Sequence, residues 1–264
     1  MLILLPPSEG KTPATSGDPV DPAALWLPAL ATARKRVLSR LVALSKRTSA
    51  RAMAGSLAVL GLSPGQTGEV TRNASLLTAP AAPAVSVYSG VLYEALDAGS
   101  LAPAARAWLD SRAVVFSGLW GVVRLDDRIP AYRLSVGVTL PGLGGLTAYW
   151  KKVLPKALDR VASDGPVLDL RSGAYSAMWT PPAGSATVRV LHERVVDGVA
   201  ERSVVSHFNK ATKGRLVRSL AEAAVTPGSV DEIVTALRDL KYTVEERPVA
   251  AGRPRQLDVV VTGL

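Results

Sequence analysis

An uninterrupted apolar run, Ala113 to Phe116, stops at Ser117-Gly118 and passes into a segment dense in Arg, Asp and Tyr. A short run of this kind, with β-branched and aromatic residues, predicts a buried strand. In α/β proteins, binding and catalytic residues gather where a buried strand gives way to a loop. The loop is therefore the first candidate site, and its polar residues are Arg124, Asp126, Asp127, Arg128, Tyr132 and Arg133.

Similar short strands alternate with helical segments along the chain. Besides 113–116 we expect strands at 1–5, 84–88 and 166–170, and helices at 100–111, 146–161 (kinked or broken near Pro155), 210–224 and 231–240, the last opened by a capping box that begins at Ser229. Hairpins come late, at 187–196 with 199–205 around Asp197-Gly198, and at 242–248 with 256–261. This order predicts the α/β class with α and β elements mixed: a central mixed β-sheet surrounded by helices, in a single domain over 1–264.

The chain has 31 Lys and Arg against 22 Asp and Glu, a net charge of +9, and no cysteine. Without cysteine, disulfides, thiolate catalysis and iron–sulfur ligation are excluded. Two histidines are too few for a histidine-rich metal site, and a carboxylate-only cation site stays open. The positive charge favours polyanionic partners, unless the arginines only solubilise the surface. The apolar runs are too short for a signal peptide or a membrane span, so we expect a cytoplasmic protein without membrane contact or cofactor.

Positive charge is concentrated in residues 23–75, where seven Lys or Arg precede Glu69, the first acidic residue. Helical composition and a glycine-containing turn at 60–65 predict a basic helical hairpin insert of the helix-hairpin-helix type. Such elements hold duplex DNA by its backbone, because turn N–H groups and nearby cations contact phosphates. The alternative is a plain helical hairpin packed on the sheet. The expected DNA-binding residues are Arg34, Lys35, Arg40, Lys46, Arg47, Arg51, Gly61 and Gly65.

Three further groups could bind an anion. A loop with Lys and hydroxyl side chains suits a phosphate or carboxylate, and the Arg fork grips either one in two bonds. We expect these groups to converge on one basic pocket, whose residues are Ser8, Lys11, Thr12, Arg124, Tyr132, Arg133, Ser172, Tyr175, Lys210, Lys213 and Arg215. Each group also has a structural alternative: a simple turn with an exposed lysine, an internal Arg–Asp pair that orders the loop, or a solvated helix face.

Six segments, in order along nearly the whole chain, resemble the YaaA family of bacterial peroxide stress proteins. Residues 117–134 are similar to the family core S-G-L-[YW]-G-V-[LV]-R-x-x-D-x-[IL]-x-x-[YF]-R-[LM], and residues 1–12 to its opening strand and Ser-Pro-x-Lys-Thr type loop. Tyr88-Ser-Gly90 and Tyr149-Trp150 match shorter elements. Residues 168–175 are similar to N-L-A-S-x-E-Y, with departures at Asp169, Arg171 and Ala174, and residues 206–215 to S-F-[YN]-x-K-x-x-R-G, with Lys213 in place of Arg.

The resemblance implies a role in surviving hydrogen peroxide, with double-stranded DNA as partner and protection from iron-driven oxidation. The chain has no haem-ligation signature and no cysteine, so nothing in it indicates a peroxidase. The alternative is an enzyme that acts on a phosphorylated or carboxylated, nucleotide-like small molecule in the basic pocket, with Ser8, Tyr132 or Tyr175 handling protons. A peripheral membrane protein is disfavoured, because the basic segment has few of the bulky aromatics that anchor interfacial helices.

Overall fold

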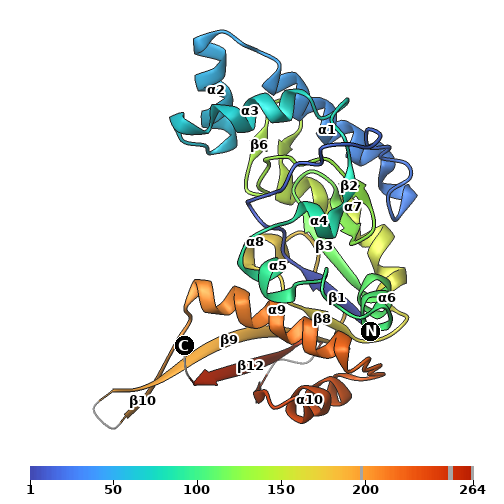
Figure 1. Cartoon of the computed structure of the whole chain (residues 1–264), viewed down its shortest axis with the longest axis vertical. Coiled ribbons are helices and arrows are strands. Elements are labelled where there is room, and N and C mark those ends of the chain that lie inside the picture. Colours follow the sequence, from blue (N-terminus) through green and yellow to red (C-terminus); the bar gives the residue numbers. More distant parts are fainter. Residues whose placement is uncertain (197–198, 249–251, 263–264) are drawn as a thin grey trace.

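The fold is organised around one mixed sheet, seen in a computed structural model that describes residues 1–196, 199–248 and 252–262 (Figure 1). The sheet has eight strands in the order β11-β12-β9-β8-β1-β3-β4, with β10 paired to β9. Their bounds are β1 Leu2–Leu5, β3 Ala113–Ser117, β4 Gly121–Arg124, β8 Val167–Asp169, β9 Ser185–Val196, β10 Val199–Ser203, β11 Thr243–Arg247 and β12 Arg255–Thr262.

The interior of the sheet is parallel. Strand β1 lies between β3 and β8, and the parallel series continues through β9 to β12. The end strands β4 and β11 pair antiparallel with β3 and β12, and β10 pairs antiparallel with β9. Because parallel strands end at the same edge, the loops that follow β1, β3 and β8 leave the sheet together, where α/β proteins usually bind ligands.

Helices surround the sheet. In Figure 1, α1, α2 and α3 lie at the end of the molecule opposite α10 and β12. The helices are α1 Ala31–Ser45, α2 Ala50–Leu60, α3 Thr67–Ala74, α4 Ala84–Val87, α5 Val91–Leu96, α6 Pro103–Arg112, α7 Leu146–Ala162, α8 Gly173–Ser176, α9 Ser206–Glu222 and α10 Val230–Asp239. Short 3-10 helices lie at Pro28–Leu30 and Pro64–Gln66. Two small antiparallel sheets, each of two short strands, pair β2 Ala82–Pro83 with β5 Arg128–Ile129 and β6 Thr139–Leu140 with β7 Gly144–Gly145.

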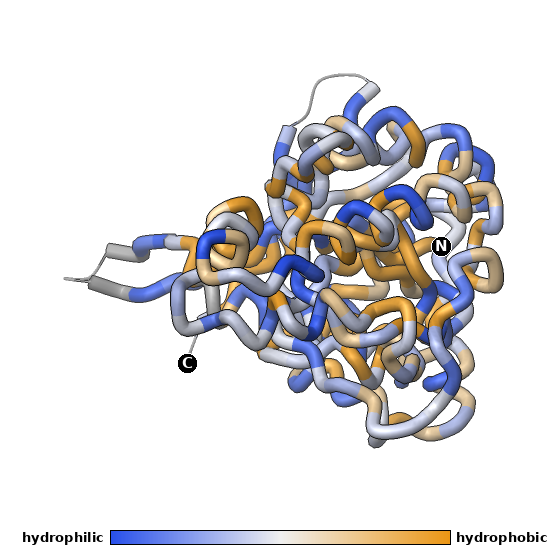
Figure 2. Tube along the Cα trace, turned by 90° about the horizontal axis from the view of Figure 1, so that it is seen from above, coloured by the Kyte–Doolittle hydropathy of each residue, from blue (hydrophilic) through white to orange (hydrophobic). Residues whose placement is uncertain are grey.

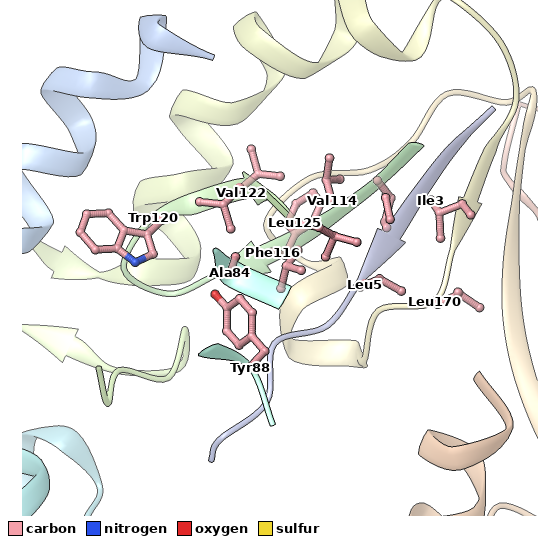
Figure 3. Close-up of a cluster of buried hydrophobic side chains, with 14 of the residues drawn as sticks. Ile3, Leu5, Ala84, Tyr88, Val114, Phe116, Trp120, Val122, Leu125 and Leu170 are labelled. Atoms are coloured by element: carbon pink, nitrogen blue, oxygen red, sulfur yellow. The ribbon is translucent and has the colours of Figure 1, made fainter. Parts of the chain in front are cut away.

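The core is centred on the parallel strands. Ile3, Leu5, Val114 and Phe116 are fully buried between the sheet and its covering helices (Figure 3). Figure 2 shows hydrophobic residues concentrated inside the fold and hydrophilic ones along its outer turns. Each buried aliphatic or aromatic side chain of this size contributes about 1.5–3 kcal/mol, so these short strands are stabilised by burial rather than by length.

The α/β fold class predicted from the sequence is confirmed, with differences in detail. Residues 84–88 were expected as a strand, but Ala84–Val87 form α4, because the Tyr88 N–H bonds the Ala84 carbonyl in a helical turn. Helix α7 continues through Pro155 and is not broken there. The late hairpin of β9 and β10 is confirmed, and its expected Asp197-Gly198 turn lies outside the described residues.

The α10 capping box is confirmed with one change. The Ser229 side chain accepts a hydrogen bond from the Glu232 N–H, as expected. The Glu232 carboxylate reaches one residue further back, to the Gly228 N–H.

Residues 23–75 are mainly helical, as expected, with α1, α2 and α3 in this segment, and they contribute to the common core. Val37 and Leu41 of α1 and Val70 of α3 belong to the same buried cluster as the sheet residues. The helix-hairpin-helix assignment of this segment stays a prediction. Within the described residues, no helix is both long enough and apolar enough to cross a membrane.

Candidate anion-binding site

The loop after β1 positions Lys11. Pro6 and Pro7 end the strand, and Lys11 then forms an isolated antiparallel bridge with Tyr88. The Ser8 hydroxyl links the same two segments, because it accepts a hydrogen bond from the Ser89 N–H (3.1 Å) and donates one to the Gly10 carbonyl. Both hydroxyl functions of Ser8 are therefore occupied in holding the loop.

The Lys11 ammonium is held without a carboxylate. Its Nζ donates to the carbonyl oxygens of Ser8 (2.8 Å) and Glu9 (3.4 Å), and it lies 4.3 Å from the centre of the Tyr132 ring. Within the described chain, no carboxylate lies within ion-pair distance of this ammonium. Burial, the larger cause, and the nearby Arg133 guanidinium together lower the pKa of Lys11 to about 7. Neutral and charged forms of this amine therefore coexist near neutral pH.

Arg133 reaches the same place from the loop after β5. The fully buried side chain of Asn73, on α3, accepts from the Arg133 N–H (2.9 Å) and donates to its carbonyl (2.8 Å). The guanidinium then pairs with the Glu9 carboxylate at 2.8 Å, although the Glu9 side chain is 83% exposed. Asn73 orders the backbone and leaves the Arg133 fork beside Lys11.

These side chains border a small cavity of about 70 Å³. Four of the predicted anion-binding residues, Ser8, Lys11, Arg133 and Tyr175, line it, and a fifth, Tyr132, lies beneath Lys11. The remaining lining residues are Pro7, Glu9, Leu134 and Ser135. The site can accept a phosphate or a short carboxylate, because a cation and a planar fork face one small space.

Beneath the cavity, buried hydroxyl groups form a chain. Ser117 Oγ accepts from the N–H groups of Leu119 and Trp120, so its own hydrogen is left to bond the Tyr132 hydroxyl, 2.6 Å away. The Tyr132 hydroxyl lies 3.0 Å from that of Tyr88. Burial raises the pKa of both tyrosines, so they stay protonated and form a neutral, hydrogen-bonded floor.

Three predicted residues lie outside the cavity. The Arg124 guanidinium lies over the Trp26 ring (5.1 Å) and lines a separate cavity beside Met1. Thr12 is exposed and its N–H bonds the Val87 carbonyl. Ser172 is exposed at the start of α8.

Helix α9 does not present the expected basic stripe. Lys210 and Arg215 are exposed, whereas Lys213 is buried and donates to the Leu170 carbonyl (2.9 Å). Lys213 precedes buried Leu216, Val217 and Leu220 at the spacing of one helix face, so it lies on the side that packs on the sheet. Its burial lowers its pKa to about 8.

The predicted DNA-binding arginine Arg34 is likewise interior. It is fully buried, and its five N–H donors bond the carbonyls of Leu25, Trp26, Leu27, Trp120 and Val122. It cannot contact a phosphate without unfolding α1, so this expectation is corrected. Its spacing to Val37, Leu38 and Leu41 is the sign, visible in the sequence, that it faces inward.

The other basic residues of α1, of α2 and of the loop between them face solvent. Lys35, Arg36 and Arg40 line a groove of about 780 Å³ with Gly142 and Tyr149. Arg47 and Arg51 line a neighbouring groove of about 430 Å³, and Lys46 is exposed beside them. None of the six pairs with a carboxylate in the part of the chain that the structure describes.

The turn between α2 and α3 differs from the expected phosphate-binding hairpin. The N–H groups of Gly61, Leu62, Ser63 and Gln66 all bond within the turn. Gly61 and Gly65 are exposed, but four turn donors are already used. Any contact with DNA therefore depends on side chains of α1 and α2 and not on these turn amides.

Sequence reasoning missed two residues of the site. Asn73 carried no local signal, because its partner is 60 residues away. Glu9 was noted only as a variation of the loop, and its contact with Arg133 spans 124 residues.

Comparison with known proteins identifies the family. The family model for peroxide stress protein YaaA matches residues 1–247. The chain belongs to the YaaA family. It is 52% identical to a UPF0246 protein of Streptomyces coelicolor over 266 residues, covering 99% of this chain and 98% of that protein. It is 43% identical to a UPF0246 protein of Corynebacterium efficiens, covering 99% of this chain and all of that protein.

Two departures from the YaaA pattern form one structural unit. Asp169 and Arg171 stand where the resembled N-L-A-S segment has Asn and Ala, and they make a buried bidentate ion pair (2.7 and 2.8 Å). Arg171 also bonds the carbonyls of Tyr175 and Trp179 and lies over the Phe116 ring. The pair thus orders the loop that places Tyr175 beside the cavity at Lys11 and Arg133.

Proposed function

We propose that this YaaA protein protects against peroxide by binding double-stranded DNA along its backbone. The observation that carries the proposal is the set of six exposed cations on α1, α2 and the loop between them, without described carboxylate partners. Arg36 and Arg40 are one helical turn apart and share a groove with Lys35, so they can follow successive phosphates. Nothing in this arrangement reads base edges, which favours binding without sequence preference.

A physical link connects this binding to iron. DNA phosphates concentrate cations around the duplex, and a protein that neutralises phosphates releases those cations. Ferrous iron held at the duplex would be displaced in the same way. Hydroxyl radicals produced from peroxide by iron would then form further from the DNA.

The test is duplex affinity measured against salt concentration. Replacing Lys35, Arg36 and Arg40 by Gln is expected to weaken binding at least tenfold and to reduce the slope of log K against log salt by roughly 2–3, since each phosphate contact contributes about 0.9. The matched control replaces three exposed cations elsewhere, Lys210, Arg215 and Arg253, by Gln. Equal weakening in the control would show that net charge alone, and not this groove, accounts for the binding.

We infer a second activity for the cavity at Lys11: it binds the phosphate or carboxylate of a small molecule on which the protein acts. The specific observation is that Arg133 already holds a carboxylate there, that of exposed Glu9. A ligand anion can take the place of Glu9 without breaking a buried contact. The two activities use different residues and are tested separately.

Thermal shift measurements with phosphate and pyruvate test this second proposal. Both anions are expected to raise the melting temperature of the wild type. Glu9→Gln should increase the shift, because it removes the competing carboxylate, and Arg133→Met should abolish it. A shift that survives Arg133→Met would place the anion elsewhere.

A further inference from the structure

Lys11 is held differently from an ordinary anion-binding lysine. Its ammonium is bordered by two carbonyl oxygens and by the face of Tyr132. The charged groups around it are Glu9 on its own loop, Arg133, and the paired Glu69 and Arg72 of α3. With Glu9 and Glu69 each paired to an arginine, little negative charge is left to hold Lys11 in its charged form.

The cavity beside this amine has the size of a very small metabolite. Its volume of about 70 Å³ leaves room for a molecule of two or three carbons with a carboxylate. Arg133 stands on its wall as the group that would grip that carboxylate. A carbonyl carbon next to the carboxylate would then lie near the Lys11 nitrogen, since both side chains line the same small space.

We propose that Lys11 is a nucleophilic amine that condenses with the carbonyl carbon of a small α-oxo acid held by Arg133. This inference rests on the second proposed activity, and it names the substrate class and the bond formed. The lone pair of the neutral amine attacks the carbonyl carbon and forms a C–N bond. A proton passes from nitrogen to oxygen, and the carbinolamine loses water to give a C=N imine. No oxidant or reductant is required.

Tyr175 is the group that can protonate the departing oxygen. It lines the cavity, and its hydroxyl lies beside the Ser135 hydroxyl and the Val136 amide, both of which can donate to it. Burial raises the pKa of Tyr175, so it keeps its proton. Ser8 cannot serve here, because its hydroxyl is already used as donor and as acceptor within the loop.

Lys213 provides a matched comparison within the chain. It is buried, whereas Lys11 is half-buried, and its pKa is also lowered, to about 8. Its Nζ donates to the Leu170 carbonyl, much as that of Lys11 donates to two carbonyls. However, the charge of the nearby Asp169 carboxylate raises the pKa of Lys213, and Lys213 does not line the cavity. A buried lysine alone therefore does not make a site; Lys11 differs because it borders a cavity with an anion-binding arginine.

Reductive trapping tests the proposal. The full chain is incubated with glyoxylate or pyruvate and cyanoborohydride, and the adducts are located by peptide mass spectrometry, which separates Lys11 from the Met1 α-amine and from the exposed lysines. We expect Lys11 to be labelled at least tenfold faster than Lys213 or any exposed lysine, with a rate that rises with pH around a midpoint near 7. Lys213→Arg should keep the label and Lys11→Arg should remove it.

The role of Arg133 gives a second readout. Arg133→Met should slow labelling by glyoxylate at least tenfold but change labelling by acetaldehyde, which has no carboxylate, much less. Labelling of wild-type Lys11 at the rate of the exposed lysines would overturn the proposal, whether or not the variants fold. If phosphate still stabilises the protein through Arg133 in that case, anion binding stands and only the imine is wrong.

Discussion

Arg171→Ala is expected to lower the free energy of unfolding by roughly 3–5 kcal/mol, because it leaves the Asp169 carboxylate buried without its partner. Both residues are nearly inaccessible, and Arg171 makes two bonds to that carboxylate. The substitution also removes the donors for the carbonyls of Tyr175 and Trp179. Urea denaturation monitored by tryptophan fluorescence measures the loss, and Arg160→Ala, at an exposed position of α7, is the control that should change little.

The double variant makes this prediction sharper. Asp169→Asn with Arg171→Ala restores the residues of the N-L-A-S pattern and removes both charges together. The double variant should therefore lose less free energy of unfolding than Arg171→Ala alone. We expect a coupling free energy on the order of 2 kcal/mol in the double-mutant cycle. Additive effects of the two substitutions would mean that Asp169 and Arg171 do not act as a unit.

Arg34→Met is expected to destabilise the protein by about 3 kcal/mol or more, because it leaves five buried or partly buried carbonyl groups without the guanidinium that now donates to them. These contacts join α1 to residues 25–27 and to the turn between β3 and β4. Loss of the guanidinium should therefore loosen the basic helices from the sheet. A sharply lower urea midpoint, without a change in the DNA affinity of the folded fraction, is the expected combination.

The adjacent residue supplies the control for Arg34. Lys35→Met lies one position further along α1, is exposed and has no described ion pair. It should change stability by less than about 0.5 kcal/mol while weakening DNA binding. If the two variants destabilised the protein equally, the burial of Arg34 could not be the cause of its effect.

Much of the fold and part of the site could be predicted from local patterns. The strands β1 and β3 are short apolar runs, and α10 begins at a capping box, so neighbouring residues were sufficient to place them. Residues 84–87 were mispredicted because an alternation of Ala, Val and Ser fits a strand or a helix equally well, and contact with the Asp127 and Leu125 carbonyls decides for the helix.

The buried cations show where attention to charge misled the interpretation. Arg34 and Lys213 each begin an apolar i, i+3, i+4, i+7 series, which places both on the inner face of a helix. The number of basic residues nearby led to the prediction that Arg34 and Lys213 lie on binding surfaces. Helical periodicity, already present in the sequence, indicates the opposite.

By itself the amino-acid sequence determined the apolar strands, the excess of positive charge, the absence of thiol chemistry and the residue types able to hold an anion. Only the tertiary structure decided that Lys11 and Arg133 share one cavity and that Arg34 and Lys213 do not face solvent. The physical reason is distance along the chain: Glu9 meets Arg133 across 124 residues and Asn73 meets it across 60. Such contacts follow from the order in which β8, β1 and β3 pair, which no local propensity encodes.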